Sequence, residues 1–497
     1  MGSSPTGPTT FLSLGGVVLT NIAAIRSSDK SVREAVKYTL NSLGLFWEEV
    51  DEPDPLRHSV AIFPEAAEFV PVSIPSIFIG ETALSYYGGE KAEVRNSPPE
   101  PAGFINVDKV KVPFFGLKYN LPGDRVLRQA PLFAKDSHFL LGYDLFRNVS
   151  YFLRGAESSL GMKRIKTSDR RFNPTILEEI RGVAPSVPIV DMHAKFLLFA
   201  ILLLHKREGF PLILKQTPPA GYNGAIAVSV PVYRTGRSRF DLLSLFRRTE
   251  SWIERLARNA DPLAFFVGRG EDYTPSKVRD LLISLEESGH EVGLLASIRA
   301  SVDHMTISEE YEELAGIIKR GNIGIRFKGI ASTLMDAWKS AAYVQADYVL
   351  AGELATGIGF PLGIGCPFKP EGLVWNIPLV AGVGSMDMAN RVANFVAKRR
   401  CMVAVDTLDE LSTISLVRSA QEQGLWVTTP GAMIDRFRSI AEVKGVFRYD
   451  RKYLEGKMMP YADVKDLQVR IINPEGRDIL LKLDLTENRS KEINVPV

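Results

Sequence analysis

Two hydrophobic patterns alternate along most of the chain. Short continuous apolar runs are typical of strands buried on both faces, and apolar residues recurring every three or four positions are typical of amphipathic helices. Within residues 1–150, the runs at 15–25 and 59–64 predict strands. Ser31–Leu43 predicts a helix whose apolar residues include Val32 and Val36. These first 150 residues are therefore predicted to form an α/β domain.

Residues 151–220 have a different texture. Helices are predicted from about 141 to 160 and from 191 to 205, and the stretch "KQTPPAGYNG" at 215–224 is dense in proline and glycine. Such a composition favours turns over regular elements. This part is predicted to be a helical connection that ends in a linker.

Residues 221–445 alternate between short apolar runs and helical segments. Thr274-Pro275 predicts a helix start with a hydroxyl cap, and Thr306 with Glu309 predicts a capping box. Strands are predicted at 225–230, 263–268, 291–296, 322–326, 373–380 and 401–405, and helices after Thr274 and Thr306 and at 333–343, 386–399, 408–423 and 430–440. Helices between buried strands favour a parallel sheet, and this many units favours a barrel over a doubly wound sheet.

Residues 446–497 form the last predicted part. "LQVRII" and "DILLKLDL" flank the turn "NPEG", which predicts a β-hairpin at the end of a β-rich tail.

Composition narrows the class of protein. The chain has 497 residues, 45% of them hydrophobic, and its 60 basic and 58 acidic residues nearly cancel to a formal +2. This balance gives no reason to expect a nucleic-acid partner or an anionic membrane surface. The longest apolar segment, 196–204, is too short to span a bilayer. Two cysteines, Cys366 and Cys401, exclude a disulfide framework, and we expect a reducing, cytoplasmic location.

Parallel strands present their functional side chains at their carboxyl ends. The polar residues predicted at these ends are Ser229, Arg326 and Asp406, with Leu295 on another strand and Arg299 just beyond it. We expect Ser229, Leu295, Arg326 and Asp406 to converge at one end of the barrel.

The order of these segments resembles the polysaccharide deacetylases, which have a distorted (β/α) barrel. The segments that carry the resemblance are "SGHEVGLLAS", "GIRFKG", "ADYVLAGELATGIGFPLGIGCPFKP" followed by "IPLV", and "GLWVTTPGAMIDRF". The region before them resembles the α/β domain that precedes the barrel in some members. The fold implied is a deacetylase-type (β/α) barrel with an amino-terminal α/β domain and a carboxyl-terminal β-hairpin tail.

The resemblance also implies a site, and this sequence departs from it. Family members hold a metal with one aspartate after the first strand and two histidines four residues apart, while a second aspartate acts as base. Here "AVSVPVY" contains no carboxylate, and the histidine positions fall on Leu295 and Arg299. A late-strand histidine position falls near Asp406, and Arg326 matches a family arginine. We therefore expect no metal, no cofactor and no catalytic residue at the mouth, and an internal ion pair between Arg326 and Asp406.

Other polar motifs are interpreted as structural. His290 precedes its strand, Asp303-His304 stands where a helix should begin, and Asp191 with His193 opens an apolar helix. Asp303 and His304 are also the candidates for a relocated site with Asp406. The glycine-rich stretch 357–365 is predicted to be a tight loop over the barrel mouth.

Three functions remain open. The first is a deacetylase-like protein that lacks metal-dependent catalysis and binds a carbohydrate at the barrel mouth through Arg326, Asp406, Arg299 and Ser229. The second is an active metal-dependent deacetylase of N-acetylated carbohydrate with relocated ligands. The third is a structural or partner-binding domain. The sequence leaves the ligand and the oligomeric state open.

Overall fold

A computed structural model describes most of the chain. It covers residues 18–19, 21–67, 73–92, 101–127, 130–154, 165–167, 170–172, 187–232, 253–260, 262–269, 274–318, 323–351, 358–360, 362–407 and 409–497. No helix within these ranges is long and apolar enough to cross a lipid bilayer. The first predicted strand, 15–25, lies partly outside them, at residues 15–17 and 20.

The amino-terminal part contains a mixed sheet with a parallel centre. Its strand order is β10-β11-β12-β5-β4-β2-β3, and the five strands from β12 to β3 are parallel. The elements of this sheet and its helices are β2 (Asn21–Ile25), α1 (Lys30–Ser42), β3 (Trp47–Val50), β4 (His58–Phe63), β5 (Ser76–Ile79), α2 (Glu81–Tyr87), β10 (Asp124–Arg125), β11 (Leu132–Lys135), β12 (His138–Leu141) and α3 (Leu145–Leu153). Every residue of β4 and β5 is buried, as expected for parallel strands covered on both faces.

Three short antiparallel pairs and a long helix complete this part. Antiparallel pairs are formed by β6 (Glu90–Ala92) with β9 (Lys118–Asn120), β7 (Gly103–Val107) with β8 (Val110–Phe114), and β13 (Ile165–Thr167) with β14 (Arg170–Phe172). Helix α5 (Ile189–Glu208) contains the predicted helix 191–205. The helix predicted from 141 to 160 was too long at its start, because β12 continues to Leu141 and α3 begins only at Leu145.

The barrel predicted from the sequence is confirmed. Strands β16 to β22 form a closed ring in the order β16-β17-β18-β19-β20-β21-β22, and every pair in it is parallel. The strands are β16 (Ala225–Pro231), β17 (Ala264–Val267), β18 (Glu291–Ala296), β19 (Ile325–Phe327), β20 (Tyr348–Ala351), β21 (Trp375–Val383) and β22 (Met402–Thr407), with β23 (Trp426–Thr428) beside β16. A closed ring excludes the doubly wound alternative. Strands β20 and β23 were not predicted as strands.

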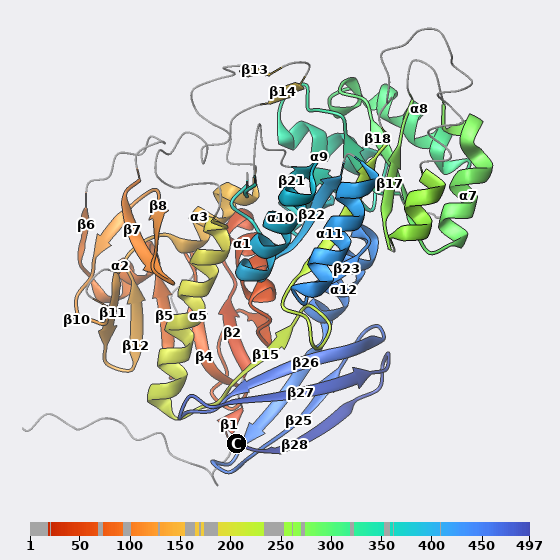
Figure 1. Cartoon of the computed structure of the whole chain (residues 1–497). Helices are drawn as coiled ribbons and strands as arrows, with labels where there is room; N and C mark the ends of the chain where they lie inside the picture. The colour runs from red at the N-terminus through yellow and green to blue at the C-terminus, as the bar shows by residue number, and fades with distance from the viewer. Residues whose placement is uncertain are drawn as a thin grey trace, which may run out of the picture.

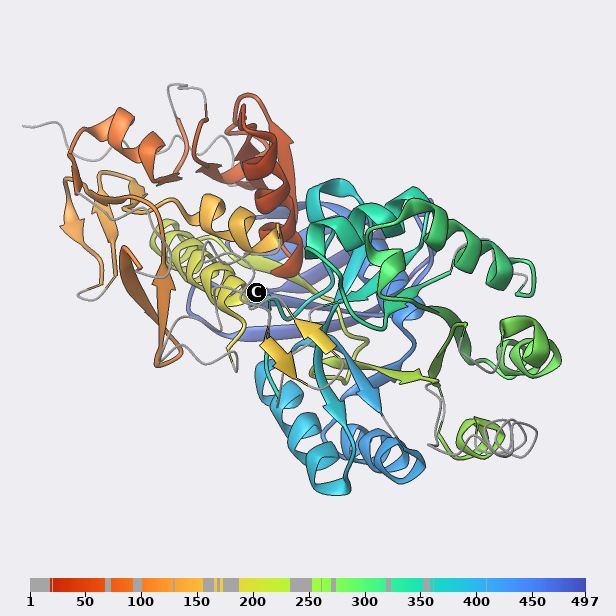
Figure 2. The same cartoon turned by 90° about the horizontal axis from the view of Figure 1, so that it is seen from above.

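Strand β16 accounts for the distortion of the barrel. Its first half pairs with β23 on one side, and its second half pairs on that same side with β17. Because β17 and β23 share one edge of β16, each can pair with only part of it. The ring of strands is therefore closed only toward their carboxyl ends, where β16 pairs with β17. Figure 2 places this barrel beside the amino-terminal part.

Helices surround the barrel at nearly the predicted positions. They are η1 (Pro275–Val278), α7 (Arg279–Glu287), η2 (Arg299–Ser301), α8 (His304–Ala315), α9 (Leu334–Tyr343), η3 (Pro370–Gly372), α10 (Met386–Arg399), α11 (Glu410–Glu422) and α12 (Pro430–Glu442). Two predicted caps were wrong. Thr274 makes no side-chain cap bond, and α8 begins at His304 with Asp303 as its cap, so that Thr306 lies inside the helix and donates to Asp303.

The carboxyl-terminal part contains the predicted hairpin within two packed sheets, below the barrel in Figure 1. The sheets have the orders β1-β24-β25-β28 and β15-β26-β27. Their strands are β1 (Val18–Leu19), β15 (Leu212–Gln216), β24 (Lys444–Tyr449), β25 (Tyr453–Met459), β26 (Val464–Ile472), β27 (Asp478–Leu485) and β28 (Lys491–Pro496). Phe447, Leu454, Leu467 and Val469 belong to the apolar core of this part. Strands from three distant parts of the chain therefore build one structure.

Lys215 lies at the junction of all three parts. The predicted linker begins in fact as the end of β15, and the Lys215 N–H donates to the Gly44 carbonyl at 2.7 Å. A Cβ on Gly44 would lie 1.8 Å from the Lys215 oxygen, so this approach requires glycine. The Lys215 Nζ donates to the carbonyls of Val443 (3.0 Å) and Ala441 (3.4 Å) at the end of α12, and lies over the Phe46 ring. Burial lowers the pKa of Lys215 to about 7.

The lowered pKa of Lys215 predicts a pH dependence of stability. Between pH 7 and pH 9.5 the unfolded chain binds a proton at Lys215 that the folded chain has released, so the free energy of unfolding should rise with pH. The limit is about 1.4 kcal/mol per pH unit for one group. We expect the stability difference between the wild type and Lys215→Met to change by about 3 kcal/mol over this interval in urea titrations. Lys452→Met, at an exposed lysine, should follow the wild-type curve. Parallel wild-type and Lys215→Met curves would contradict the argument.

Candidate functional site

The candidate site is a polar layer inside the barrel at the carboxyl ends of its strands. Ser229 of β16 is in register with Asp406 of β22, and Leu295 of β18 is in register with Arg326 of β19. Arg326 and Asp406 are joined by hydrogen bonds across the barrel. The predicted convergence of these four residues is confirmed.

Strand alternation explains why Arg326 points inward. Ile325 and Phe327 belong to the core that the helices cover, whereas Leu295 and Leu350 of the neighbouring strands belong to the interior core of the barrel. Because side chains alternate between the two faces of a strand, the central residue of β19 faces the interior.

The ion pair between Arg326 and Asp406 is present, as predicted. The Arg326 Nη2 and Nε donate to Asp406 Oδ2 at 2.9 and 3.2 Å, and Nη1 donates to the Phe327 carbonyl. The side chains are 2% and 8% exposed. A buried guanidinium requires a carboxylate and further acceptors, because an unpaired buried charge is very costly.

Two polar atoms of this layer remain without a partner. Within the described part of the chain, Asp406 Oδ1 and Ser229 Oγ are buried and have no hydrogen-bond partner. The register of β16 and β22 places these two residues side by side. Asp406 Oδ1 can accept a hydrogen bond and Ser229 Oγ can donate or accept one, which is the complement of a ligand hydroxyl group.

Leu295 and Arg299 contribute no polar atoms to the layer inside the barrel. Leu295 is buried in the barrel core with Phe266 and Leu350. Arg299 lies beyond the strand in η2, its side chain is 78% exposed, and it pairs with Asp303 at 2.8 Å. The positive charge expected from Arg299 is therefore at the rim, whereas Arg326 is inside.

The remaining predicted polar residues have structural partners. His290 accepts from the Leu263 N–H at 3.3 Å through Nδ1, and its Nε2 lies 3.1 Å from the Ala257 carbonyl. Asp303 accepts from Met305 N at the start of α8, and the His304 ring stacks on Tyr343. These contacts agree with the structural interpretation.

Asp191 and His193 hold α5 against its neighbours. Asp191 accepts from the Tyr38 hydroxyl at 2.8 Å and from Gly365 N at 3.0 Å. It thereby connects the amino-terminal part to the barrel, and burial raises its pKa to about 6. His193 contacts the Tyr143 hydroxyl at 3.0 Å, and burial lowers its pKa to about 4.

The carboxyl-terminal half of the glycine-rich stretch does not lie over the barrel mouth. Gly363 accepts from Val190 N, and Gly365 accepts from Met402 N at the amino-terminal end of β22. The prediction was wrong for the described part of the stretch, because Phe360, Leu362 and Ile364 belong to the core outside the barrel, which the helices cover. Residues 352–357 and Pro361 lie outside the described ranges.

Sequence reasoning missed a pair of buried carboxyl groups. Glu65 follows β4 and accepts from Phe146 N at the start of α3, and Asp144 accepts from the Tyr119 hydroxyl. Burial, and next the Asp144 charge, raises the pKa of Glu65 to about 8; burial raises that of Asp144 to about 6. The available signal was an acidic residue just after each of two buried strands of a parallel sheet.

No metal centre is found among the described residues. No group of three or more His, Cys, Asp or Glu side chains there is arranged to hold a metal ion. Cys366 and Cys401 are free thiols, and burial raises the pKa of both.

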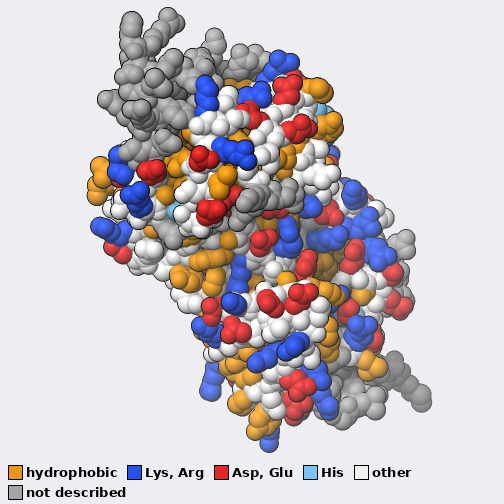
Figure 3. Space-filling model, turned by 90° about the vertical axis from the view of Figure 1, so that its right-hand side faces the viewer, with side chains coloured by type: hydrophobic (Ala, Val, Ile, Leu, Met, Phe, Trp, Pro, Cys, Tyr) orange, Lys and Arg blue, Asp and Glu red, His pale blue; other side chains and the backbone are white. Residues whose placement is uncertain are grey.

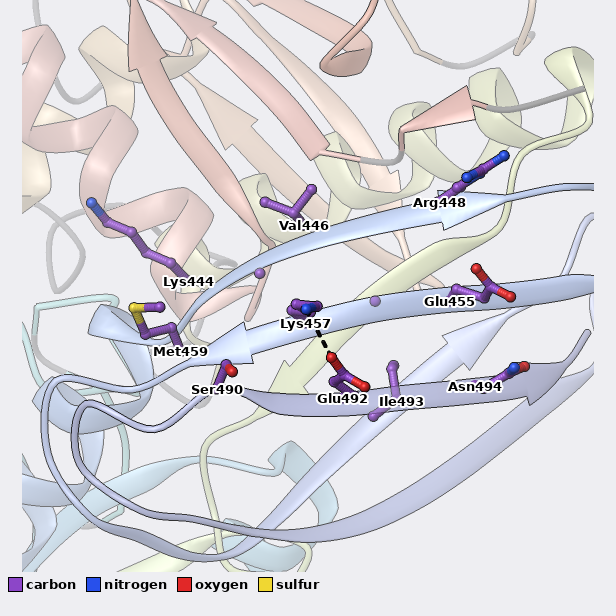
Figure 4. Close-up of a pocket in the computed structure, with 12 residues that line it drawn as sticks. Lys444, Val446, Arg448, Glu455, Lys457, Met459, Ser490, Glu492, Ile493 and Asn494 are labelled. Atoms are coloured by element: carbon purple, nitrogen blue, oxygen red, sulfur yellow. Dashed lines mark ion pairs between the residues drawn. The ribbon is translucent and has the colours of Figure 1, made fainter. Parts of the chain in front are cut away.

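The surface offers a broad hollow far from the mouth. It has a volume of about 960 Å³ and lies on the β24-β25-β28 sheet, where Lys457 pairs with Glu492 at 2.7 Å (Figure 4). On the side of the molecule in Figure 3, basic and acidic side chains are interspersed. This agrees with the near-neutral composition.

Comparisons with known proteins found similar solved structures only at low sequence identity. No family model matches the sequence, and no curated protein matches it. Solved structures similar to this chain include a CE4 family pseudoenzyme from Bacillus anthracis, with 10% identity, a TM-score of 0.26, and coverage of 43% of this chain and 66% of that one.

Two further similar structures are a domain of a xylanase and a polysaccharide deacetylase. The CE4 domain of a multidomain xylanase from the hindgut metagenome of Trinervitermes trinervoides has 12% identity and a TM-score of 0.26, covering 43% and 90% of the two chains. A polysaccharide deacetylase from Bacillus cereus has 12% identity and a TM-score of 0.21, covering 41% and 91%.

The buried ion pair predicts a large and asymmetric mutational effect. Arg326→Met leaves the Asp406 carboxylate buried and unpaired, so we expect a loss of about 3–5 kcal/mol in the free energy of unfolding. Arg326→Met combined with Asp406→Leu should lose less than Arg326→Met alone, because no buried charge remains. The matched control is Arg299→Ala, which removes an exposed pair and should cost less than about 1 kcal/mol. Equal losses for Arg326→Met and Arg299→Ala in urea titrations would exclude the role given to the buried pair.

Proposed function

We propose that this chain is a polysaccharide deacetylase-like protein that has lost metal-dependent catalysis and binds a carbohydrate at its barrel mouth. The observation that carries the proposal is the Arg326–Asp406 ion pair, which occupies the barrel interior where the sequence resemblance implies a metal centre. The positive charge of the Arg326 guanidinium takes the place of the positive charge of a metal ion.

The available side chains support the loss of catalysis. The implied mechanism needs a metal that polarises an acetamide carbonyl and lowers the pKa of water, and a carboxylate base. The first strand carries Ser229 and no carboxylate of its own in "AVSVPVY", and Leu295 replaces an imidazole ligand with an apolar side chain. The Asp406 carboxylate already pairs with Arg326. Neither leucine nor a guanidinium can be a metal ligand.

The same layer supports binding of a hydroxyl-rich ligand. Ser229 and Asp406 are neighbours in register, and Ser229 Oγ and Asp406 Oδ1 have no hydrogen-bond partner within the described structure. Arg299 at the rim offers donors in a planar arrangement that suits a carboxylate or sugar hydroxyls. In this proposal a carbohydrate contacts Arg299 first, and one hydroxyl reaches Asp406 and Ser229.

Cellular context and organisation form part of the proposal. Both cysteines are free thiols, which supports a reducing, cytoplasmic location. We retain the division into an α/β domain (1–150), a connection (151–220), the barrel (221–445) and a tail (446–497). Nucleic acid is not a proposed partner, because the net charge is only +2.

The proposal predicts that the purified protein carries no stoichiometric metal. Protein prepared without chelators should contain much less than one zinc, cobalt or nickel ion per chain by mass spectrometry. It should release no acetate from oligomers of N-acetylglucosamine, with or without added metal. About one ion per chain together with acetate release would instead establish the active deacetylase with relocated ligands.

The proposal also predicts that the rim arginine contributes to binding. In a calorimetric panel of neutral and acidic oligosaccharides, we expect at least one ligand whose affinity falls about tenfold in Arg299→Ala, equivalent to about 1.4 kcal/mol. Thermal stability should change little, because Arg299 is exposed. Arg391→Ala, which removes an exposed arginine of α10, is the control. If no carbohydrate binds, or if both variants bind like the wild type, the ligand-binding half of the proposal fails.

The third candidate is a partner-binding domain. The exposed β24-β25-β28 face favours it, since Val446 and Met459 are exposed there beside charged residues. If the protein binds neither metal nor carbohydrate, the partner-binding function remains as the candidate.

A further inference from the structure

A second cavity lies between the amino-terminal part and the barrel. It has a volume of about 380 Å³, within the range of small-molecule sites. The start of α1, the end of α3 and the η3 turn of the barrel line it. Its lining residues are Asp29, Lys30, Ser31, Glu34, Ser150, Leu153, Arg154, Lys369 and Glu371.

The position of the cavity follows from the topology of the parallel sheet. Strand β2 pairs with β3 on one side and with β4 on the other. The chain leaves β2 through α1 to reach β3, and then returns to β4 on the opposite side. In open α/β sheets, ligands bind outside the carboxyl ends of the strands at this kind of switch point. Helix α1 begins just after β2 and packs beside α3, as Figure 1 shows.

Several charges of the lining are already paired. Asp29 accepts from the backbone and hydroxyl of Ser31, both at 2.8 Å, and so caps α1. Arg154 pairs with Glu371 at 2.8 Å. Glu371 has φ +47°, an uncommon conformation for a residue other than glycine, and this pair joins the two parts of the chain across the cavity.

Two cationic groups of the lining remain available. Across the described ranges, the Lys30 and Lys369 side chains make neither an ion pair nor a hydrogen bond, and both residues are exposed. They come from opposite walls, one from α1 and the other from the barrel. The paired carboxylates of Asp29 and Glu371 still have lone pairs that can accept hydrogen bonds from hydroxyl groups.

We propose that this cavity binds a small acidic sugar, a monosaccharide that carries one carboxylate or phosphate. Lys30 and Lys369 hold the anionic group from the two walls. Asp29, Ser150 and Glu371 bind the hydroxyl groups. The site is separate from the barrel mouth and does not depend on the function proposed for it. A ligand here contacts both parts of the chain and stabilises their junction.

Titration calorimetry of the whole protein tests this site with glucuronate, glucose 6-phosphate, glucose and inorganic phosphate as probes. We expect one of the two acidic sugars to bind at least tenfold more tightly than both glucose and inorganic phosphate. Glucuronate and glucose 6-phosphate distinguish a carboxylate from a phosphate as the anionic group.

Variants locate the binding. Lys30→Gln with Lys369→Gln should weaken binding of the preferred sugar at least tenfold, and Lys398→Gln, at an exposed lysine on α10, should not. Equal binding of phosphate and sugar would overturn the proposal, because it would indicate a simple anion site. Wild-type affinity in the double variant, or no binding of either acidic sugar, would also overturn it. Circular dichroism should confirm that both variants are folded.

Discussion

The guanidinium of Arg326 places the strongest constraint on this barrel. A charge inside a parallel barrel is tolerated only with a carboxylate and further acceptors nearby. Asp406 on β22 supplies the carboxylate, and the Phe327 carbonyl takes another guanidinium N–H. The pair spans the barrel, so it fixes β19 relative to β22. The barrel mouth is therefore organised around an ion pair. Ser229 and Leu295 complete the layer.

The other parts of the molecule are joined by buried polar groups of the same kind. Asp191 accepts from Tyr38 of α1 and from Gly365 of the barrel, while Lys215 donates to the end of α12. These groups are buried where apolar surfaces from different parts of the chain meet. Because a buried polar group must be satisfied by a specific partner, such contacts fix relative orientation more sharply than apolar packing does.

The two proposed sites have different physical characters. At the barrel mouth, the polar atoms without partners are buried beside an ion pair, and only Arg299 is exposed. Between the parts of the chain, the available groups are exposed lysines around a cavity. The first arrangement suits one hydroxyl group in a dry environment, and the second suits a hydrated anion. A protein that binds sugars at both would use hydrogen bonding at one and charge at the other.

The sequence by itself determined the barrel, most of its helices, and the convergence of Ser229, Leu295, Arg326 and Asp406. These follow from local periodicity and from the rule that parallel strands share one end. It also determined the structural roles of His290 and Asp191. It did not determine the partners of Lys215, because Gly44 and Val443 come from distant segments, as does the β26 partner of β15, and such pairings leave no periodic signal. Tertiary packing likewise decided the caps of η1 and α8, the positions of residues 358–360 and 362–365, and the buried pair Glu65 and Asp144. In most of these cases the deciding contact joins residues that are far apart in the chain. For the helix caps, it depends on which of several neighbouring polar side chains accepts a hydrogen bond from a free N–H group.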